Sequence, residues 1–277
     1  MLDLTNLSQL KQFLHDSHLW LNKKLGQNFL IDREVLADIV KTSQLSKDDT
    51  VVEIGPGVGT LTQELCKNAG EVLAIEKDRG LAAILAKSCK DDNLKILVDN
   101  ALFAIAKIHF KRYKVVANLP YNISSPTLRF FLEKPNKPQM LVLLLQKEVA
   151  QRLTAKPGDS NRGILTVMLE FYARAEIVRS VPSTAFFPIP KVDSAIIKID
   201  TNVKRPQNIN EEIFFRLVKL SFQQKRRQIH NSLSSGLRLD AGKTGEIFAK
   251  AGISPVLRSE DLTLDDWLRL YENLPKG

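Results

Sequence analysis

Short apolar runs alternate with amphipathic stretches through the middle of the chain. The apolar runs are nearly continuous and often β-branched, which is typical of strands buried on both faces of a sheet. The predicted strands are Thr50–Ile54, Val72–Ile75, Leu94–Val98, Lys114–Ala117 and Met140–Leu145. Between them, helical periodicity predicts helices at Leu61–Asn68, Arg79–Cys89 and Thr127–Leu132. This order of elements predicts a parallel sheet with helices on both faces, an α/β fold.

Two further strands follow at Ala173–Val181 and Ser194–Ile199. Little helical sequence separates them, so we expect an antiparallel hairpin at the edge of the sheet. The helix at Thr127–Leu132 has a start signal of its own, with Ser125 as the predicted N-cap and Pro126 at the first helical position.

The pattern changes after Asp200, where Asn202–Asn210 has the composition of a linker. Beyond it, Glu211–Leu233 and Thr263–Asn273 have helical periodicity. We expect breaks in this helical region at its glycines, in Ser234–Gly236 and at Gly242. At the other end of the chain, three leucines with helical spacing predict a surface helix: Leu7, Leu10 and Leu14. The predicted organisation is an N-terminal extension (1–22), an α/β domain (23–204) and a small all-helical domain (205–277).

Composition narrows the class of protein. The 277 residues are 44% hydrophobic and 26% charged, as in an ordinary globular protein. The longest apolar run, Met140–Leu145, is far shorter than the ~20 residues of a membrane helix. Residues 1–22 lack the apolar core of a signal peptide. Cys66 and Cys89 belong to no Cys/His cluster, so we expect neither structural zinc nor a disulfide framework, and a cytoplasmic location.

The charge points to a polyanionic partner. Lysine and arginine number 40 and aspartate and glutamate 31, a net charge of +9. Such an excess favours nucleic acid or an anionic membrane as partner, although a generic basic surface explains it equally well.

A glycine-rich turn connects the first predicted strand to the next helix. Gly55, Gly57 and Gly59 permit a tight turn and close approach of the backbone to a ligand. Glu76 lies about 20 residues further on, at the end of the next strand, where a carboxylate accepts hydrogen bonds from ribose hydroxyls. The pattern favours a nucleoside site over a plain turn. Because it differs from G-x-G-x-x-G, it disfavours, without excluding, a hydride-transfer enzyme.

A second turn, Asn118-Leu119-Pro120-Tyr121, directly follows the strand at Lys114–Ala117. It is therefore expected at the carboxyl edge of the sheet, where such folds place their sites. The Asn118 oxygen, nearby carbonyls and an aromatic face suit an exocyclic amine on a planar base. A purely structural turn is the alternative.

Basic residues form a stripe with helical spacing in the C-terminal part. Its members are Arg216, Lys219, Gln223, Arg226 and His230. An apolar stripe adjoins it, made of Phe215, Val218, Phe222, Ile229 and Leu233. Lys225 and Arg227 add charge at its margins. One helix of this kind can pack by its apolar face and bind phosphates by its basic face; a solvated charged face is the alternative.

Together these segments resemble the small-subunit ribosomal RNA adenine N6-dimethyltransferase family, of the KsgA type. The resemblance rests on motifs in the family's order, from about residue 23 to the C-terminus. They are Lys23–Leu30 (KKLGQNFL), Val52–Gly57 (VEIGPG), Asn118–Ile123 (NLPYNI), Gln146–Leu153 (QKEVAQRL), Phe186–Ala195 (FFPIPKVDSA) and Phe222–Arg227 (FQQKRR). No single motif is specific, but the set is.

The resemblance implies a Rossmann-like methyltransferase domain that uses S-adenosylmethionine and no metal. Asn28 and Leu30 would close over the donor, Gly55 and Gly57 would pass under its methionine part, and Glu76 would hold its ribose. Asn118, with Leu119 and Pro120, would stand between the donor and the target adenine. The resemblance assigns stacking on that adenine to Tyr121 and Phe186, and RNA contact to Arg216, Lys219, Lys225, Arg226 and Arg227. Phe187 is the less favoured stacking residue.

The sequence departs from the family pattern at three places. Where the family has Gly-Asp-Ala-Leu, this chain has Asp99-Asn100-Ala101-Leu102, so either Asp99 or Asn100 would contact the donor adenine. Arg162 stands where the family has tyrosine. Residues 1–22 extend beyond the family's usual start.

The implied activity is dimethylation of N6 on two adjacent adenosines in the 3′-terminal hairpin loop of 16S (small-subunit) rRNA. The expected partner is a pre-ribosomal small subunit, with no membrane contact, and the expected state is a monomer. Two alternatives stay open: a large-subunit adenine dimethylase that confers antibiotic resistance, and a non-catalytic RNA-binding assembly or transcription factor on the same fold.

Overall fold

The computed structural model describes residues 2–17, 27–224, 227–237 and 239–275. The chain forms two compact units. The first contains Met1–Ala150 and Ala175–Asn202, and the second contains Gln151–Arg174 and Val203–Gly277. The second unit thus begins near the predicted boundary at residue 205 but also takes in residues 151–174, which the predicted organisation assigned to the α/β domain.

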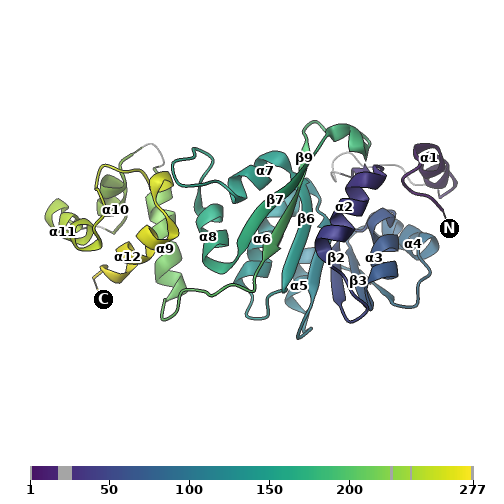
Figure 1. Ribbon diagram of the computed structural model, residues 1–277, viewed down its shortest axis with the longest axis horizontal. Helices are drawn as coiled ribbons and strands as arrows, with labels where there is room; N and C mark the ends of the chain where they lie inside the picture. Colours follow the sequence, from purple (N-terminus) through teal and green to yellow (C-terminus); the bar gives the residue numbers. More distant parts are fainter. Residues whose placement is uncertain (1, 18–26, 225–226, 238, 276–277) are drawn as a thin grey trace. The chain divides into compact units, whose positions relative to one another are not determined.

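A seven-stranded sheet forms the centre of the first unit (Figure 1). In order across the sheet, its strands are β4 (Leu94–Val98), β3 (Glu71–Glu76), β2 (Thr50–Ile54), β5 (Lys114–Asn118), β6 (Met140–Gln146), β9 (Ser194–Asp200) and β7 (Arg174–Val181). The strands from β4 to β6 run parallel to one another. β9 is antiparallel to β6 and lies between β6 and β7. The parallel sheet and the neighbouring edge strands confirm the predicted α/β fold.

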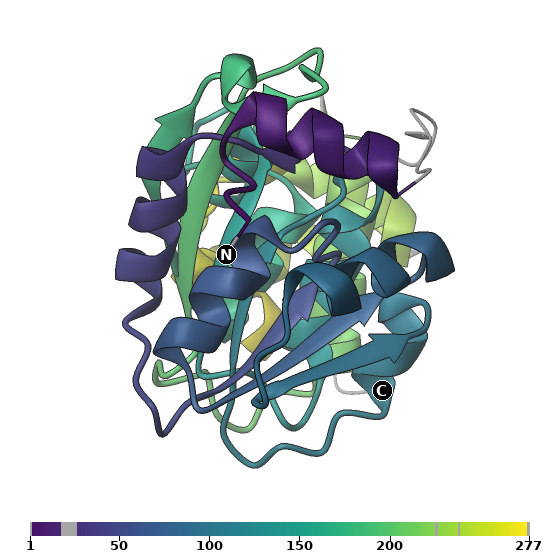
Figure 2. The same ribbon diagram turned by 90° about the vertical axis from the view of Figure 1, so that its right-hand side faces the viewer.

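Both faces of this sheet are buried at its central strands. Val51, Val116 and Val142 pack under helix α2 (Arg33–Ser43) and helix α3 (Thr60–Asn68) in one hydrophobic cluster. Because side chains alternate along a strand, the neighbouring positions face the other way, and these are buried too: Val52, Val115, Leu141 and Leu143. Four further helices belong mainly to this unit and lie around the sheet in Figures 1 and 2: α4 (Arg79–Ser88), α5 (Ala101–Ala106), α6 (Ser124–Glu133) and α7 (Lys147–Leu153).

The start of α6 differs from the prediction. The helix begins at Ser124, so Ser125 and Pro126 lie inside its first turn, and Ser125 is not the N-cap. A 3-10 turn, η2 (Tyr121–Ile123), leads directly into it, and the Ser124 hydroxyl donates to the carbonyl oxygen of Pro120 at 3.2 Å. The turn before the helix therefore sets its first residue.

Two elements lie outside the main sheet. The predicted N-terminal helix is present as α1 (Leu7–Asp16), with Leu10 and Leu14 buried. A two-stranded ribbon pairs β1 (Phe29–Leu30) with β8 (Phe186–Phe187) in antiparallel fashion. The ribbon was not predicted, because two-residue strands show no periodicity.

The second unit is built mainly of helices in its described residues. Its helices are α8 (Ile164–Tyr172), α9 (Glu211–Phe222), α10 (Ile229–Leu237), α11 (Ala241–Ala251) and α12 (Leu264–Glu272). Phe171 of α8 packs against Phe214 of α9, with 4.9 Å between the ring centroids. The two residues are far apart in sequence. A local sequence pattern therefore could not show that residues 151–174 belong to the second unit.

Two predictions for the second unit were wrong. Glu211–Leu233 is not one helix, because α9 ends at Phe222 and α10 begins at Ile229. The predicted breaks at Ser234–Gly236 and Gly242 are absent, because α10 runs through the first and Gly242 lies inside α11. A Cβ atom on Gly236 would lie 3.0 Å from the Cβ atom of Leu220, so this glycine serves the close approach of α9 and α10. Among the helices of the described residues, none is long and apolar enough to span a bilayer.

Candidate active site

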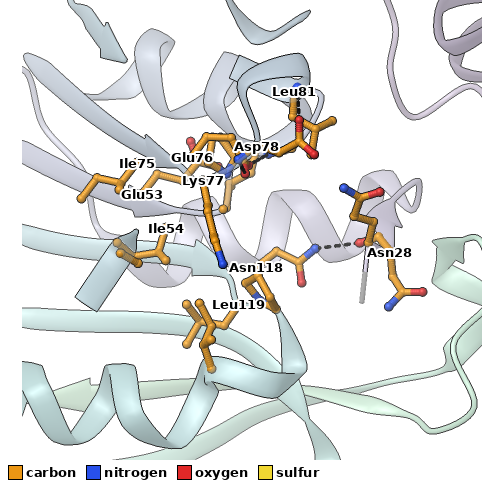
Figure 3. A pocket seen from close by; sticks show the side chains of 18 of the residues that line it. Asn28, Glu53, Ile54, Ile75, Glu76, Lys77, Asp78, Leu81, Asn118 and Leu119 are labelled. Atoms are coloured by element: carbon orange, nitrogen blue, oxygen red, sulfur yellow. Dashed lines mark hydrogen bonds between the residues drawn. The ribbon is translucent and has the colours of Figure 1, made fainter. Parts of the chain in front are cut away.

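A cavity of about 320 Å³ opens at the carboxyl ends of β2, β3 and β5 (Figure 3). Parallel strands present these ends at one edge, where open α/β sheets bind their ligands. The first wall is the glycine turn after β2. The second is the end of β3 around Glu76, and the third is the segment that begins at Asn118. Residues of β1, including Phe29, and Asn100 after β4 also line the cavity.

The glycine turn needs its glycines for both conformation and space. Gly55 and Gly57 have φ angles of +67° and +60°, a left-handed backbone that favours glycine. A Cβ atom on Gly57 would lie 2.9 Å from the Phe29 ring, and one on Gly55 would lie 3.1 Å from the Pro120 ring. The turn therefore packs between Phe29 and Pro120, and its glycines present backbone atoms to the cavity.

Glu76 is held by the backbone on both sides. Its Oε1 atom accepts from the Asp78 amide at 2.9 Å, and its Oε2 atom accepts from the Gly57 amide at 3.3 Å. Burial raises the pKa of this carboxyl, while the backbone amides act in the opposite direction. The side chain lines the cavity with its position fixed, which suits a pair of adjacent hydroxyls (Figure 3).

Glu53 is a second carboxyl at the cavity, which the sequence analysis did not identify. It is 1% exposed and accepts from the Thr62 hydroxyl at 2.7 Å. Burial raises its pKa to about 8. The available signal was a charged residue inside an otherwise apolar strand, since such residues are almost never fully buried without a partner.

The Asn118 side chain has a defined orientation. Its Nδ2 atom donates to the backbone carbonyl of Asn28 at 3.2 Å, which leaves Oδ1 as the acceptor of the side chain (Figure 3). Leu119 is buried, and its amide donates to the Leu144 carbonyl at 3.0 Å. The Tyr121 hydroxyl lies 2.8 Å from the Ser194 hydroxyl. Contacts to other segments therefore fix this turn at the cavity.

The structure brings most of the predicted site residues together. Those that line the cavity are Asn28, Leu30, Gly55, Gly57, Glu76, Asn100, Asn118, Leu119, Pro120 and Tyr121. Of the two alternatives after β4, Asn100 lines the cavity and caps α5 by accepting from the Leu102 amide. Asp99 lies outside this lining and pairs with Lys107 at 3.4 Å.

Phe186 is not among the cavity residues. In the ribbon of β1 and β8, Phe29 pairs with Phe187, and Leu30 pairs with Phe186. Phe186 is 1% exposed and packs in the core beneath α2, whereas Phe187 is partly buried on the other side, near Phe29. The stacking role of Phe186 stays a prediction, since its ring is covered in this structure.

The predicted basic stripe is divided by the break between α9 and α10. Arg216 and Lys219 are exposed on α9, and His230 lies on α10. Arg227 is exposed between the helices, while Lys225 and Arg226 lie outside the described residues.

Backbone contacts explain the break. The Ser259 hydroxyl donates to the Ser221 carbonyl at 2.9 Å, and the Ile229 amide donates to the Leu257 carbonyl at 2.8 Å. Gln228 also forms a β-bridge with Arg258. The chain therefore pairs with the segment before α12 instead of continuing the helix.

Arg162 connects several segments of the second unit by hydrogen bonds. Its guanidinium is fully buried and binds both oxygens of Glu170 at 2.6 Å. It also donates to the carbonyls of Ala155 at 3.0 Å and Leu262 at 3.1 Å. Within the described residues, no three His, Cys, Asp or Glu side chains gather as metal ligands would.

The sheet, with the cavity at its carboxyl edge, has a Rossmann-like arrangement, and the second unit is built of helices. The family model for ribosomal RNA adenine dimethylase matches residues 19–276. The chain belongs to this family.

Curated relatives and solved structures agree with the assignment. The chain is 40% identical to ribosomal RNA small subunit methyltransferase A of Clostridium botulinum (strain Loch Maree / Type A3), over 95% of this chain and 97% of that protein. It is 38% identical to the protein of the same name from Halothermothrix orenii, over 95% and 91%.

Two solved structures resemble it. A dimethyladenosine transferase from Plasmodium falciparum matches with a TM-score of 0.74 and 26% identity, over 87% of this chain and 95% of that one. The 23S rRNA methyltransferase ErmE matches with a TM-score of 0.71 and 31% identity, over 90% and 100%.

Proposed function

We propose that this protein uses S-adenosylmethionine to dimethylate N6 of two adjacent adenosines in the 3′-terminal hairpin loop of small-subunit rRNA. The observation that carries the proposal is the Asn118 amide, oriented by Asn28 at the rim of a cavity that also holds Glu76. The substrate would be a pre-ribosomal small subunit in the cytoplasm, bound by a monomer.

The cavity suits the donor in shape and chemistry. Glu76 offers a fixed carboxylate for the ribose hydroxyls, and Asn100 lies near for the adenine. The Thr60 hydroxyl is buried at the cavity and has no hydrogen-bond partner among the described residues, so it fits a polar group of the ligand. When bound, the donor supplies a methyl group already activated by its sulfonium, so the protein needs no metal or covalent nucleophile.

The chemical task of the protein is to prepare the adenine amine. Its lone pair is delocalised into the ring, which makes the nitrogen a weak nucleophile. Hydrogen bonds from the amine to Asn118 Oδ1 and to a carbonyl of Leu119 or Pro120 would favour a tetrahedral nitrogen and stabilise the positive charge that develops. Alignment of the reacting groups contributes roughly 7–11 kcal/mol in favourable cases. The proton that the nitrogen then loses is acidic, so no strong base is required.

The target adenine has to leave the RNA stack to reach this point. Tyr121 lies at the cavity and its hydroxyl is held near Ser194, which fixes the direction in which the ring points. Stacking on such a ring contributes about 1–3 kcal/mol per base. The exposed cations Arg216, Lys219 and Arg227 would hold the RNA by its phosphates.

The test is to incubate the protein with labelled methyl donor and either small subunits lacking the modification or naked large-subunit RNA, and to map the methylated nucleotides. We expect dimethylation of two adjacent adenosines in the small subunit. Methylation of large-subunit RNA instead would favour the large-subunit dimethylase; the structure also resembles a 23S rRNA methyltransferase, ErmE. Binding of subunits without methyl transfer would favour a non-catalytic factor.

The Asn118→Ala variant tests the chemistry. Loss of an oriented hydrogen bond to a developing charge costs roughly 10²–10³ in turnover, so we expect a fall of this size in single-turnover methyl transfer with both substrates saturating. Subunit binding should be retained. The exposed Asn161, in the other unit, provides the control variant Asn161→Ala, which should keep the parent rate. A rate for Asn118→Ala within a few-fold of the parent would remove Asn118 from the mechanism.

A further inference from the structure

The N-terminal segment of the first unit forms a helix with one strongly buried side. Asn6 caps α1 by accepting from the amides of Ser8 and Gln9. Leu10 is 0% exposed and Leu14 is 5% exposed, whereas Leu7 on the same helix is 37% exposed. The helix therefore binds the rest of the unit by a defined stripe of leucines, which a freely solvated extension would not do.

The surface beneath this stripe belongs to the walls of the donor cavity. Residues of α1 and its leading turn pack with those of the cavity in one group, here called the N-terminal cluster: Leu4, Leu10, Leu14, Phe29, Val58, Leu81 and Ile84. Phe29 and Leu81 of this cluster also line the cavity, and Val58 lies inside the glycine turn. Figures 1 and 2 show α1 beside α4, which carries Leu81 and Ile84.

Phe29 contacts both the N-terminal cluster and the glycine turn. Its ring would lie 2.9 Å from a Cβ atom on Gly57, so the ring rests directly on the turn. The Phe29 ring is thus held between α1 on one side and the turn on the other. A side chain fixed in this way loses no further conformational freedom when a ligand binds beside it.

Three contacts of charged side chains anchor the helix and its leading turn. Arg33 at the start of α2 donates from Nε to the Thr5 hydroxyl at 2.8 Å and forms an ion pair with Asp3. The ammonium of Lys11 on α1 lies 5.1 Å from the centre of the ring of Phe187, the ribbon partner of Phe29. The segment is therefore tied both to α2 and to the ribbon that closes the cavity.

We propose that α1 is a positioning element of the methyl-donor site: its leucines hold Phe29 and Leu81 in the conformation that binds the donor. The inference rests on the proposed function of the cavity. The residues of α1 lie before residue 19, where the match to the family model begins.

The test compares leucines of one helix. In the full-length protein, the variant with Leu10→Ala and Leu14→Ala should raise the donor Kd and the donor KM by about tenfold, because the loosened cavity residues must be ordered on binding. The KM for small subunits and the kcat at saturating donor should stay within about twofold of the parent. Leu7→Ala, which removes an exposed leucine, is the matched control and should leave every constant unchanged.

A second variant separates positioning from loss of folding. Leu10→Met with Leu14→Met keeps the apolar volume and should restore the donor Kd, with the circular dichroism spectrum of each variant measured as a check of folding. If the alanine variant is unfolded, Leu14→Ala alone is used for the same comparison. A folded alanine variant with the parent's donor Kd would overturn the role of α1 alone. Failure of the parent itself to bind S-adenosylmethionine would overturn the proposed function, and this inference with it.

Discussion

Glu76 binds two backbone amides, from Gly57 and Asp78, and these hydrogen bonds determine what its removal should do. We expect Glu76→Ala to weaken S-adenosylmethionine binding by roughly 1.5–3 kcal/mol, the range for hydrogen bonds to charged groups. Calorimetric titration measures this directly, and RNA affinity should change little. Glu71, at the other end of the same strand and paired with Lys95, supplies the control Glu71→Ala. Equal donor affinities for both variants would exclude Glu76 from the site.

Glu53 gives the protein a pH dependence of stability. Its pKa is raised by burial from the ordinary 4.5 to about 8 in the folded protein. The folded state therefore keeps a proton that the unfolded chain loses, so the stabilising contribution is full below about pH 4.5 and is lost as the pH rises toward 8. We expect the free energy of unfolding of Glu53→Gln to decline less between pH 5 and pH 8 than that of the parent.

Denaturant titrations at several pH values across this window provide the measurement. A glutamine at position 53 still accepts from Thr62, so the comparison isolates the titration. Glu64→Gln, on the adjoining helix, serves as the control and should follow the parent curve. Parallel curves for the parent and Glu53→Gln would mean that Glu53 is ionised throughout the window.

At the level of single residues, the sequence predicted the cavity better than it predicted the aromatic groups. Gly55, Gly57, Glu76 and Asn118 follow strands whose ends meet at one edge, so strand order alone brings them together. Phe186 depends instead on which side of a two-residue strand it occupies. A shift of one residue exchanges the two sides, and nothing in a segment so short fixes that choice in advance.

The elements of the second unit determine how RNA affinity should respond to salt. Arg216 and Lys219 are one turn apart on the exposed side of α9. Changing both to glutamine should lower RNA affinity and flatten its dependence on salt by about 0.7–0.9 log units for each phosphate that is no longer neutralised. Filter binding across a salt series measures the slope. Lys243 and Lys250, exposed on α11, are the control pair, and identical slopes for the two double variants would mean that α9 does not bind phosphates.

The strands of the main sheet and the helices α3, α4, α6 and α12 were predicted within a few residues. The interruption after Phe222 was not predicted, and neither were the helices α2, α5, α7, α8 and α11. Apolar and basic stripes continue in register from Phe215 to Leu233, so the local pattern favours one helix. The break depends on hydrogen bonds from Ser259 and to Leu257, which lie farther along the chain. Local helix propensity does not depend on such distant partners. Here the tertiary contacts outweigh the local preference for one helix.

On the scale of the whole molecule, the stability of the second unit depends on residues 151–174 as well as on the C-terminal helices. Arg162 joins Ala155, Glu170 and Leu262 through one guanidinium with no exposed surface. Glu170→Ala would leave that charge buried without its partner, and breaking a buried pair in this way costs about 3–5 kcal/mol. The expected result is a clear loss of stability in denaturant unfolding.

The control for this prediction is Glu246→Ala, which removes an exposed partner of Lys250 and should cost less than about 1 kcal/mol. S-adenosylmethionine affinity of the folded Glu170→Ala variant should match that of the parent, because its cavity residues all belong to the first unit. A loss of stability no greater than that of the control would show that the protein relaxes around the unpaired arginine.

The position of β9 between β6 and β7 has a consequence for synthesis on the ribosome. A nascent chain emerges from its N-terminus, so β6 is complete well before its partner β9 has been translated. Through that interval, the strand Met140–Gln146, whose central residues are all buried in the finished protein, presents an open hydrophobic edge. Such edges promote association between chains. We therefore expect that slowing translation between residues 147 and 193 increases association between nascent chains, measured as the aggregated fraction.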